Sequence, residues 1–92
     1  MTPPELEELR RAIDEVDRKL LDLLAERVRL VLAVGDVKRT RGVPVHDPDR
    51  ERRVLDRVAE AAPPPLDGPT VRRVWERLIE ESRRIEERHV AG

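Results

Sequence analysis

The chain contains no cysteine, no phenylalanine and no tyrosine, and Trp75 is its single tryptophan. Without cysteine it has no disulfide, no thiolate chemistry and no sulfur-ligated metal site, which fits a reducing compartment. Without aromatic rings to stack on bases, it lacks the usual means of binding single-stranded nucleic acid. The core must therefore be built from aliphatic side chains.

Long apolar runs and an excess of one charge are also missing. No stretch approaches the roughly 18 apolar residues of a membrane-spanning helix, and the amino-terminal residues have no apolar segment typical of a signal peptide. Charged residues make up 42% of the chain, but 19 basic and 20 acidic side chains leave a net charge of −1. This balance argues against nucleic acid and anionic membranes as partners. We expect a soluble, cytoplasmic protein.

What the chain does have is a long row of apolar residues at helical spacing. Steps of mostly three and four residues connect Leu6, Leu9, Ile13, Val16, Leu20, Leu23, Leu30, Val34 and Val37. This spacing predicts a helix over about residues 4–40, packed against other helices. About 35 residues span roughly 50 Å, whereas a compact chain of this size has a radius of gyration of about 12 Å. One chain cannot cover such a row, so we expect a helical homodimer.

Two shorter helices are predicted at about residues 48–61 and 69–89. Asp47-Pro48 and Asp67-Gly68-Pro69 are typical helix starts, and Pro63–Pro65 ends the second helix. The second helix has an inward face of Val54, Leu55 and Val58, and the third has a row of Val71, Trp75, Leu78, Ser82, Ile85 and His89. The pattern predicts an all-α fold and one domain over residues 1–92.

Arg27 interrupts the first apolar row, at the position due between Leu23 and Leu30. A guanidinium stays protonated at any ordinary pH, so burying it requires an anion nearby, either a protein carboxylate or a ligand. Lys38 lies eleven residues later on the same helical face, about 16 Å along the axis, and has no acid one turn before or after it. Two such cations can hold a small dianion between them.

Four further polar residues occupy or border the inward faces of the second and third helices: Asp47, Glu51, Ser82 and Glu86. Each also has a structural explanation. Asp47 can be an N-cap, and Glu51 can neutralise either Arg27 or Lys38. Ser82 can hydrogen-bond to its own helix, and Glu86 can be solvated. Taken together, they describe a pocket with cationic, acidic and hydroxyl side chains from three helices.

Other charged groups are expected on the surface. Arg50 stands beside two more arginines on what the pattern indicates is an exposed face. His46 and His89 lie in loop or terminal surroundings, and we expect no metal site from them.

Five segments resemble the all-helical (AroQ-type) chorismate mutases in order and spacing. They are Leu9–Asp14, Leu20–Arg27, Val34–Lys38, Pro44–Glu51 and Ile79–Ser82, within a resemblance that covers about residues 5 to 90. The resemblance implies an intertwined helical homodimer with two equivalent active sites. It implies an isomerase of phenylalanine and tyrosine biosynthesis, which rearranges chorismate to prephenate without a cofactor.

The resemblance also implies a set of carboxylate-binding residues. Arg27 would bind one substrate carboxylate, and Arg10 would reach the same site from the partner subunit. Arg10 lies about 100° around the helix from Arg27, which agrees with this division between two chains. Ser82 would touch a carboxylate, and Arg50 would contribute to the electrostatics.

The remaining roles concern the ring hydroxyl and the ether oxygen of chorismate. Asp47, through its backbone, and Glu51 would hold the hydroxyl. Lys38 would donate to the ether oxygen and a carboxylate. Glu86 occupies a position that is glutamine in many bacterial members and glutamate in fungal ones. Because an ionised carboxylate has no proton to donate, Glu86 must be protonated to act there, and we expect turnover to be highest at acidic pH.

Two other functions remain open at this stage. An isochorismate-pyruvate lyase uses the same helical scaffold and a similar cationic pocket. A non-catalytic helical dimer could instead serve as a regulatory or docking module. A complex with another shikimate-pathway enzyme is a further expectation for a chain of this kind.

Overall fold

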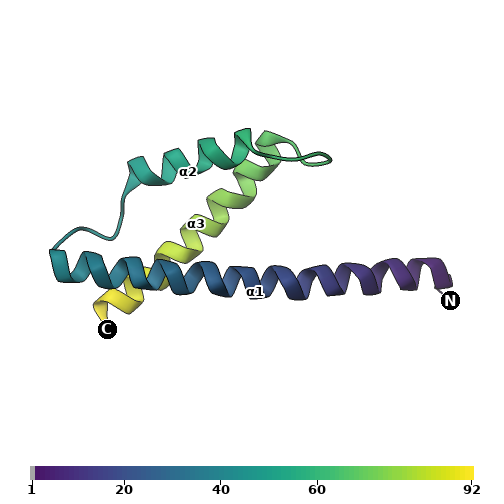
Figure 1. Cartoon of the computed structure of the whole chain (residues 1–92), viewed down its shortest axis with the longest axis horizontal. Coiled ribbons are helices and arrows are strands. Elements are labelled where there is room, and N and C mark those ends of the chain that lie inside the picture. Colours follow the sequence, from purple (N-terminus) through teal and green to yellow (C-terminus); the bar gives the residue numbers. More distant parts are fainter. Residues whose placement is uncertain (1) are drawn as a thin grey trace. The chain divides into compact units, whose positions relative to one another are not determined.

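The computed structural model describes residues 2–92 and contains three α-helices (Figure 1). Helix α1 spans Pro4–Arg41, α2 spans Pro48–Glu60 and α3 spans Gly68–Ala91. The predicted all-α fold is confirmed, and the helix ends lie within two residues of the predicted ones. None of the helices within residues 2–92 is both long enough and apolar enough to cross a membrane.

Aspartates begin α2 and α3, as their sequences predict. The Asp47 side chain accepts a hydrogen bond from the backbone N–H of Arg50 at 3.1 Å, and Asp67 accepts one from that of Thr70 at 2.8 Å. The Thr70 N–H favours the ionised form and thereby lowers the pKa of the Asp67 carboxyl. The stability that this cap contributes is present above the ordinary pKa of an aspartate and is lost as the pH falls through the lowered value.

The end of α1 turns sharply at Gly42, which has a φ of +68°. The N–H of Val43 donates to the carbonyl of Lys38 at 2.9 Å, and the N–H of Gly42 donates to that of Arg39 at 3.4 Å. These two bonds form a Schellman motif, in which glycine adopts the left-handed conformation at low cost. The motif directs the following loop back past the last turn of α1. A cis peptide bond joins Pro64 to Pro65 in the later linker.

The chain divides into two compact units, the first ending at Leu30 and the second covering Val31–Gly92. The first unit consists of one helix, so it holds no other element against which its apolar row could pack. Leu9, Leu20 and Leu23 accordingly remain 64%, 51% and 60% exposed.

In the second unit, α2 packs against α3. The predicted inward face of α2 is confirmed, because Val54 is buried while Leu55 and Val58 are half-buried. In the predicted face of α3, every residue except His89 is buried or half-buried, and Ile79 and Glu86 are buried in addition.

The buried face of α3 is wider than the predicted row because this helix has two partners. Toward its start, Arg72 forms an ion pair with Asp56 of α2 at 2.6 Å. Toward its end, Glu86 pairs with Lys38 of α1. Apolar residues spaced three and four positions apart form one row along a helix, and such a row predicts packing against one partner helix only. The second contact buries Glu86, which the sequence pattern placed at the border.

Candidate active site

Lys38 and Glu86 form a buried ion pair between the last turns of α1 and the second half of α3. Lys38 Nζ lies 3.2 Å from Glu86 Oε2, and the two side chains are only 18% and 8% exposed. The same ammonium donates a hydrogen bond to the carbonyl oxygen of Val45 at 2.6 Å. The loop that follows the Schellman motif therefore helps to fix the cation. The sequence shows no acid one turn from Lys38 and offered Glu51 as a possible partner, whereas the carboxylate found beside it belongs to Glu86, 48 residues away along the chain.

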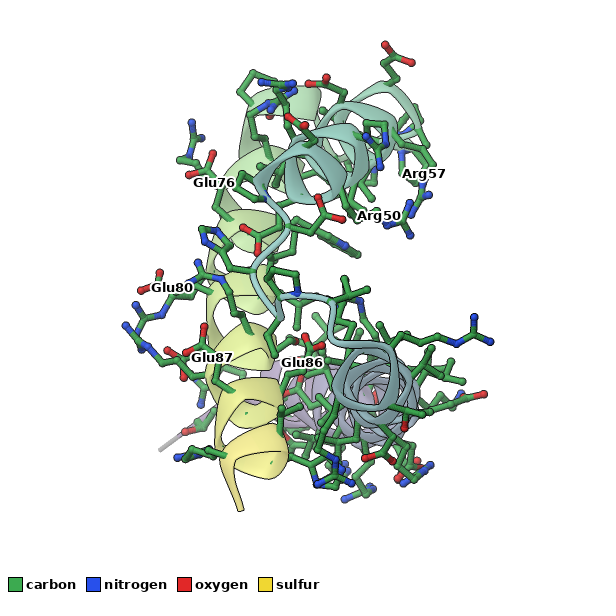
Figure 2. The ribbon with its side chains drawn as sticks, turned by 90° about the vertical axis from the view of Figure 1, so that its left-hand side faces the viewer. Arg50, Arg57, Glu76, Glu80, Glu86 and Glu87 are labelled. Carbon is green, nitrogen blue, oxygen red and sulfur yellow. The ribbon has the colours of Figure 1, made fainter. Side chains whose placement is uncertain are left out.

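Glu86 points from α3 toward α1, whereas Glu76, Glu80 and Glu87 project from the other side of the helix (Figure 2). Its Oε2 atom is buried and makes no hydrogen bond, so the ion pair with Lys38 lacks hydrogen-bond geometry. Buried polar atoms in folded proteins are nearly always hydrogen-bonded, and exceptions occur at functional sites. Glu86 is therefore buried rather than solvated, and its carboxylate has room for one more donor.

Gly35 of α1 makes this arrangement possible. A Cβ atom added there would lie 3.0 Å from Cγ of Glu86, 3.1 Å from Cγ2 of Val90 and 3.5 Å from Glu86 Oε2. The first two distances are shorter than ordinary van der Waals contacts. The absence of a side chain at position 35 therefore lets the Glu86 carboxyl lie directly against α1. The sequence analysis did not single out this glycine.

Glu51 lies one turn into α2, with a basic side chain near each of its two carboxylate oxygens. Arg83 of α3 donates from Nε to Glu51 Oε2 at 3.0 Å, and Nε2 of His46 lies 3.7 Å from Glu51 Oε1. Arg27 and Lys38 were the candidate bases for neutralising Glu51. Lys38 pairs with Glu86, and Arg83, which the sequence did not suggest, is a base beside Glu51.

His89 and Asp36 join the end of α3 to α1. His89 Nε2 lies 2.7 Å from Asp36 Oδ1, and the same carboxylate oxygen is 3.5 Å from an Arg39 nitrogen. His89 is exposed, as expected, but it is also a link between two helices. Within residues 2–92, no group of three or more His, Cys, Asp or Glu side chains is arranged to hold a metal ion.

The other predicted site residues lie on all three helices. Ser82 is buried at 4% exposure, one turn before Glu86. Asp47 is the N-cap of α2, and Arg50 is exposed and projects from α2 (Figure 2). Arg10 and Arg27 belong to the first unit, which is a single helix. Their part in the site stays a prediction.

Comparison with known proteins decides the family. The model of a family described as chorismate mutase type II matches residues 9–87. The chain belongs to this family. It is therefore an isomerase of the chorismate mutase class, as the resemblance implied.

Three relatives show how much of the chain this family accounts for. A chorismate mutase of Methanocaldococcus jannaschii is 33% identical over 92% of this chain and 87% of its own length. A crystal structure of the Helicobacter pylori chorismate mutase in complex with prephenate has a TM-score of 0.89 and 28% identity, and the match covers 98% of both chains. A bifunctional chorismate mutase/prephenate dehydratase of Escherichia coli is 41% identical over 80% of this chain, which spans 19% of that protein.

Proposed function

We propose that the chain converts chorismate to prephenate in a pocket centred on Lys38 and Glu86, completed by Arg10 of a second copy. The observation that carries this proposal is the buried Lys38–Glu86 pair, with Nζ and Oε2 3.2 Å apart, in a chain of the chorismate mutase family. A largely buried cation beside a buried carboxylate oxygen that lacks a hydrogen bond suits a site that receives an anionic ligand. The prephenate bound by the Helicobacter pylori relative supports the same ligand class here.

The rearrangement requires positioning and electrostatic stabilisation, and it needs no nucleophile. The enolpyruvyl side chain of chorismate must fold over the ring before the new carbon–carbon bond forms, and binding in a shaped site supplies this orientation. As the carbon–oxygen bond breaks, negative charge develops on the ether oxygen. Donors fixed at that oxygen stabilise the transition state more than the ground state.

Lys38 is suited to donate to the ether oxygen. An ammonium has three N–H donors, of which one reaches the carbonyl of Val45 and another faces Glu86. The third can serve the substrate while the first two hold the group in place. A side chain oriented in advance in this way loses little free energy to reorganisation when charge develops.

Glu86 is the second donor in this proposal, and it acts only when protonated. In the free protein the carboxyl faces the Lys38 ammonium. In the complex, two substrate carboxylates bring negative charge to the same cations, and a protonated Glu86 can then donate to the ether oxygen. Ionised Glu86 would instead repel the developing charge.

The rest of the proposed pocket follows the resemblance. Arg27 and Ser82 would bind substrate carboxylates together with Arg10 of the second copy. Asp47, through its backbone, and Glu51 would hold the ring hydroxyl, while Arg50 adds positive charge.

Substituting Gly35 with alanine is expected to lower kcat by about tenfold, because small displacements of catalytic groups have large effects on rate. The new Cβ would meet Glu86 Cγ at 3.0 Å and push the carboxyl away from its place beside Lys38. Alanine is favoured over glycine inside a helix by about 1 kcal/mol, so helix propensity cannot explain a loss. Kinetics and a thermal melt of the same sample check this. An unchanged kcat would show that Glu86 does not depend on this close approach.

The active form in this proposal is a homodimer. The apolar row of the first unit is exposed, and an identical helix has the matching row to cover it. Leu20→Glu is expected to raise the dimer dissociation constant by about a thousandfold, since each of two symmetric sites loses about 2 kcal/mol of apolar burial. Analytical ultracentrifugation measures this. Lys19→Glu introduces the same residue one position earlier, off the row, and should leave the dimer intact.

Product identification separates the mutase from the alternatives. Purified protein is supplied separately with chorismate and with isochorismate, and the products are identified by chromatography. Prephenate from chorismate supports the proposal, while pyruvate released from isochorismate alone would make the chain a lyase. If neither substrate reacts and prephenate at about 100 times a micromolar dissociation constant fails to add the expected 2.7 kcal/mol or so of stability, the chain is a non-catalytic module.

Two further expectations extend beyond the site. A complex with another shikimate-pathway enzyme remains a prediction, and the Escherichia coli relative, whose name joins two activities, gives it a precedent within one chain. A cytoplasmic location likewise remains a prediction of the sequence.

A further inference from the structure

The two carboxylate oxygens of Glu51 have different neighbours: Arg83 is bound to one, and His46 lies near the other. Arg83 Nε donates to Oε2 at 3.0 Å, a full hydrogen bond between oppositely charged groups. His46 Nε2 lies 3.7 Å from Oε1, which is beyond hydrogen-bond distance. One oxygen of Glu51 is therefore anchored by a hydrogen bond, whereas His46 lies too far from the other to form one.

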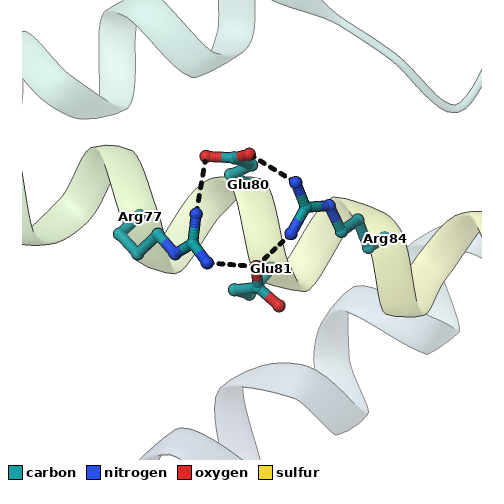
Figure 3. Close-up of polar contacts among 4 residues, drawn as sticks. All are labelled: Arg77, Glu80, Glu81 and Arg84. Atoms are coloured by element: carbon teal, nitrogen blue, oxygen red, sulfur yellow. Dashed lines mark hydrogen bonds and ion pairs between the residues drawn. The ribbon is translucent and has the colours of Figure 1, made fainter.

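This pair differs from the ion pairs formed within α3. Arg77 and Arg84 alternate with Glu80 and Glu81 on one exposed face, where each contact links residues three or four positions apart (Figure 3). Exposed pairs of this kind contribute little to stability. The Arg83–Glu51 pair instead spans 32 residues, joins α3 to α2, and has side chains only 28% and 25% exposed.

Two consecutive arginines of α3 thus point to different partners. Arg84 pairs with Glu80 and Glu81 of its own helix. Arg83 follows the buried Ser82 directly and precedes the buried Glu86 by three residues. It therefore stands beside the buried face of α3 that carries the proposed site, and reaches from there to α2.

We infer that Arg83 is a positioning residue of the active site, which holds the Glu51 carboxylate so that Oε1 faces the ring hydroxyl of the substrate. This inference rests on the proposed function, in which Glu51 accepts that hydroxyl. Arginine suits the task because its guanidinium is always charged and its Nε–H has a fixed direction. Without it, Glu51 would rotate among several rotamers and bind the hydroxyl less well.

The test is a double-mutant cycle on chorismate turnover with Arg83→Met, Glu51→Ala and the combined variant. Arg83→Met is expected to raise KM about tenfold with a much smaller change in kcat, because the hydroxyl lies away from the breaking bond. In the Glu51→Ala background, the same change should have an effect of less than about twofold, because Arg83 acts through Glu51. Arg83→Gln, a second variant of different polarity, should behave like Arg83→Met.

Arg84→Met is the matched control, since it removes the neighbouring arginine from an exposed face. It should leave KM and kcat unchanged. Losses from Arg83→Met and Glu51→Ala that multiply in the combined variant would overturn the inference, because Arg83 would then act independently of Glu51. An unchanged KM in folded Arg83→Met and Arg83→Gln would overturn it as well.

Failure of the proposed function and failure of this inference are distinguishable. The same cycle is measured by calorimetric binding of prephenate, so a readout exists apart from turnover. A wild-type chain that neither converts chorismate nor binds prephenate would overturn the proposed function and this inference together. An active wild type with multiplying losses would overturn this inference alone.

Discussion

Replacing Lys38 with alanine is expected to lower kcat/KM for chorismate by about a thousandfold, which is the effect of removing a donor aimed at a developing oxyanion. The ammonium is fixed in advance by the carbonyl of Val45 and by Glu86, at 2.6 and 3.2 Å. Its loss therefore removes a stabilising interaction that water does not replace. Steady-state kinetics on the dimeric variant measures the effect.

The controls for Lys38 separate catalysis from stability. Lys19, the other lysine of the chain, is exposed in the first unit, and Lys19→Ala should retain full activity. Lys38→Ala leaves Glu86 as an uncompensated buried carboxylate, which is destabilising. Adding Glu86→Gln should restore much of the melting temperature without restoring turnover. Full activity in folded Lys38→Ala would mean that the pocket lies elsewhere.

The second large effect concerns pH. Turnover of the wild-type chain is expected to be highest at acidic pH and to fall as Glu86 ionises in the complex, because only the protonated carboxyl can donate to the ether oxygen. The direction follows from the chemistry: raising the pH removes the proton that the transition state needs. Initial rates at saturating chorismate from about pH 4.5 to 8.5 define the profile.

Glu86→Gln tests the cause of that profile. A glutamine amide donates at every pH in the range, so the variant should be active at neutral pH and show a nearly flat profile. Glu87→Gln makes the same change on the adjacent residue, which projects from the other side of α3 (Figure 2), and should keep the wild-type profile. If Glu86→Gln kept the wild-type fall in rate at rising pH, another group would be responsible.

Local sequence signals predicted most of the fold. Asp47 and Asp67 predicted the starts of α2 and α3, since N-caps act through residues only three positions away. The long apolar row predicted α1, whose row remains exposed in the first unit. The face of α3 was predicted less well, because a single periodic row cannot describe a helix that contacts α2 along one part and α1 along another.

The candidate site was likewise predicted only in part from the sequence. Lys38, Glu51, Ser82 and Glu86 were identified as candidates because polar residues at inward positions are visible in the sequence. The sequence did not reveal that Lys38 pairs with Glu86 or that Glu51 pairs with Arg83. The contacts of Lys38 with Glu86 and of Arg83 with Glu51 join residues more than 30 positions apart, so they depend on how the helices cross. The role of Gly35 also depends on a contact between helices, because it follows from the close approach of the Glu86 side chain to α1.

The most direct test of the account is a crystal structure of the chain with prephenate bound. The account predicts a homodimer in which the Lys38 ammonium lies within about 3 Å of a ligand oxygen, Glu86 lines the same pocket, and the partner subunit contributes a contact from its Arg10. Prephenate bound away from Lys38, or bound with Glu86 outside its pocket, would contradict it.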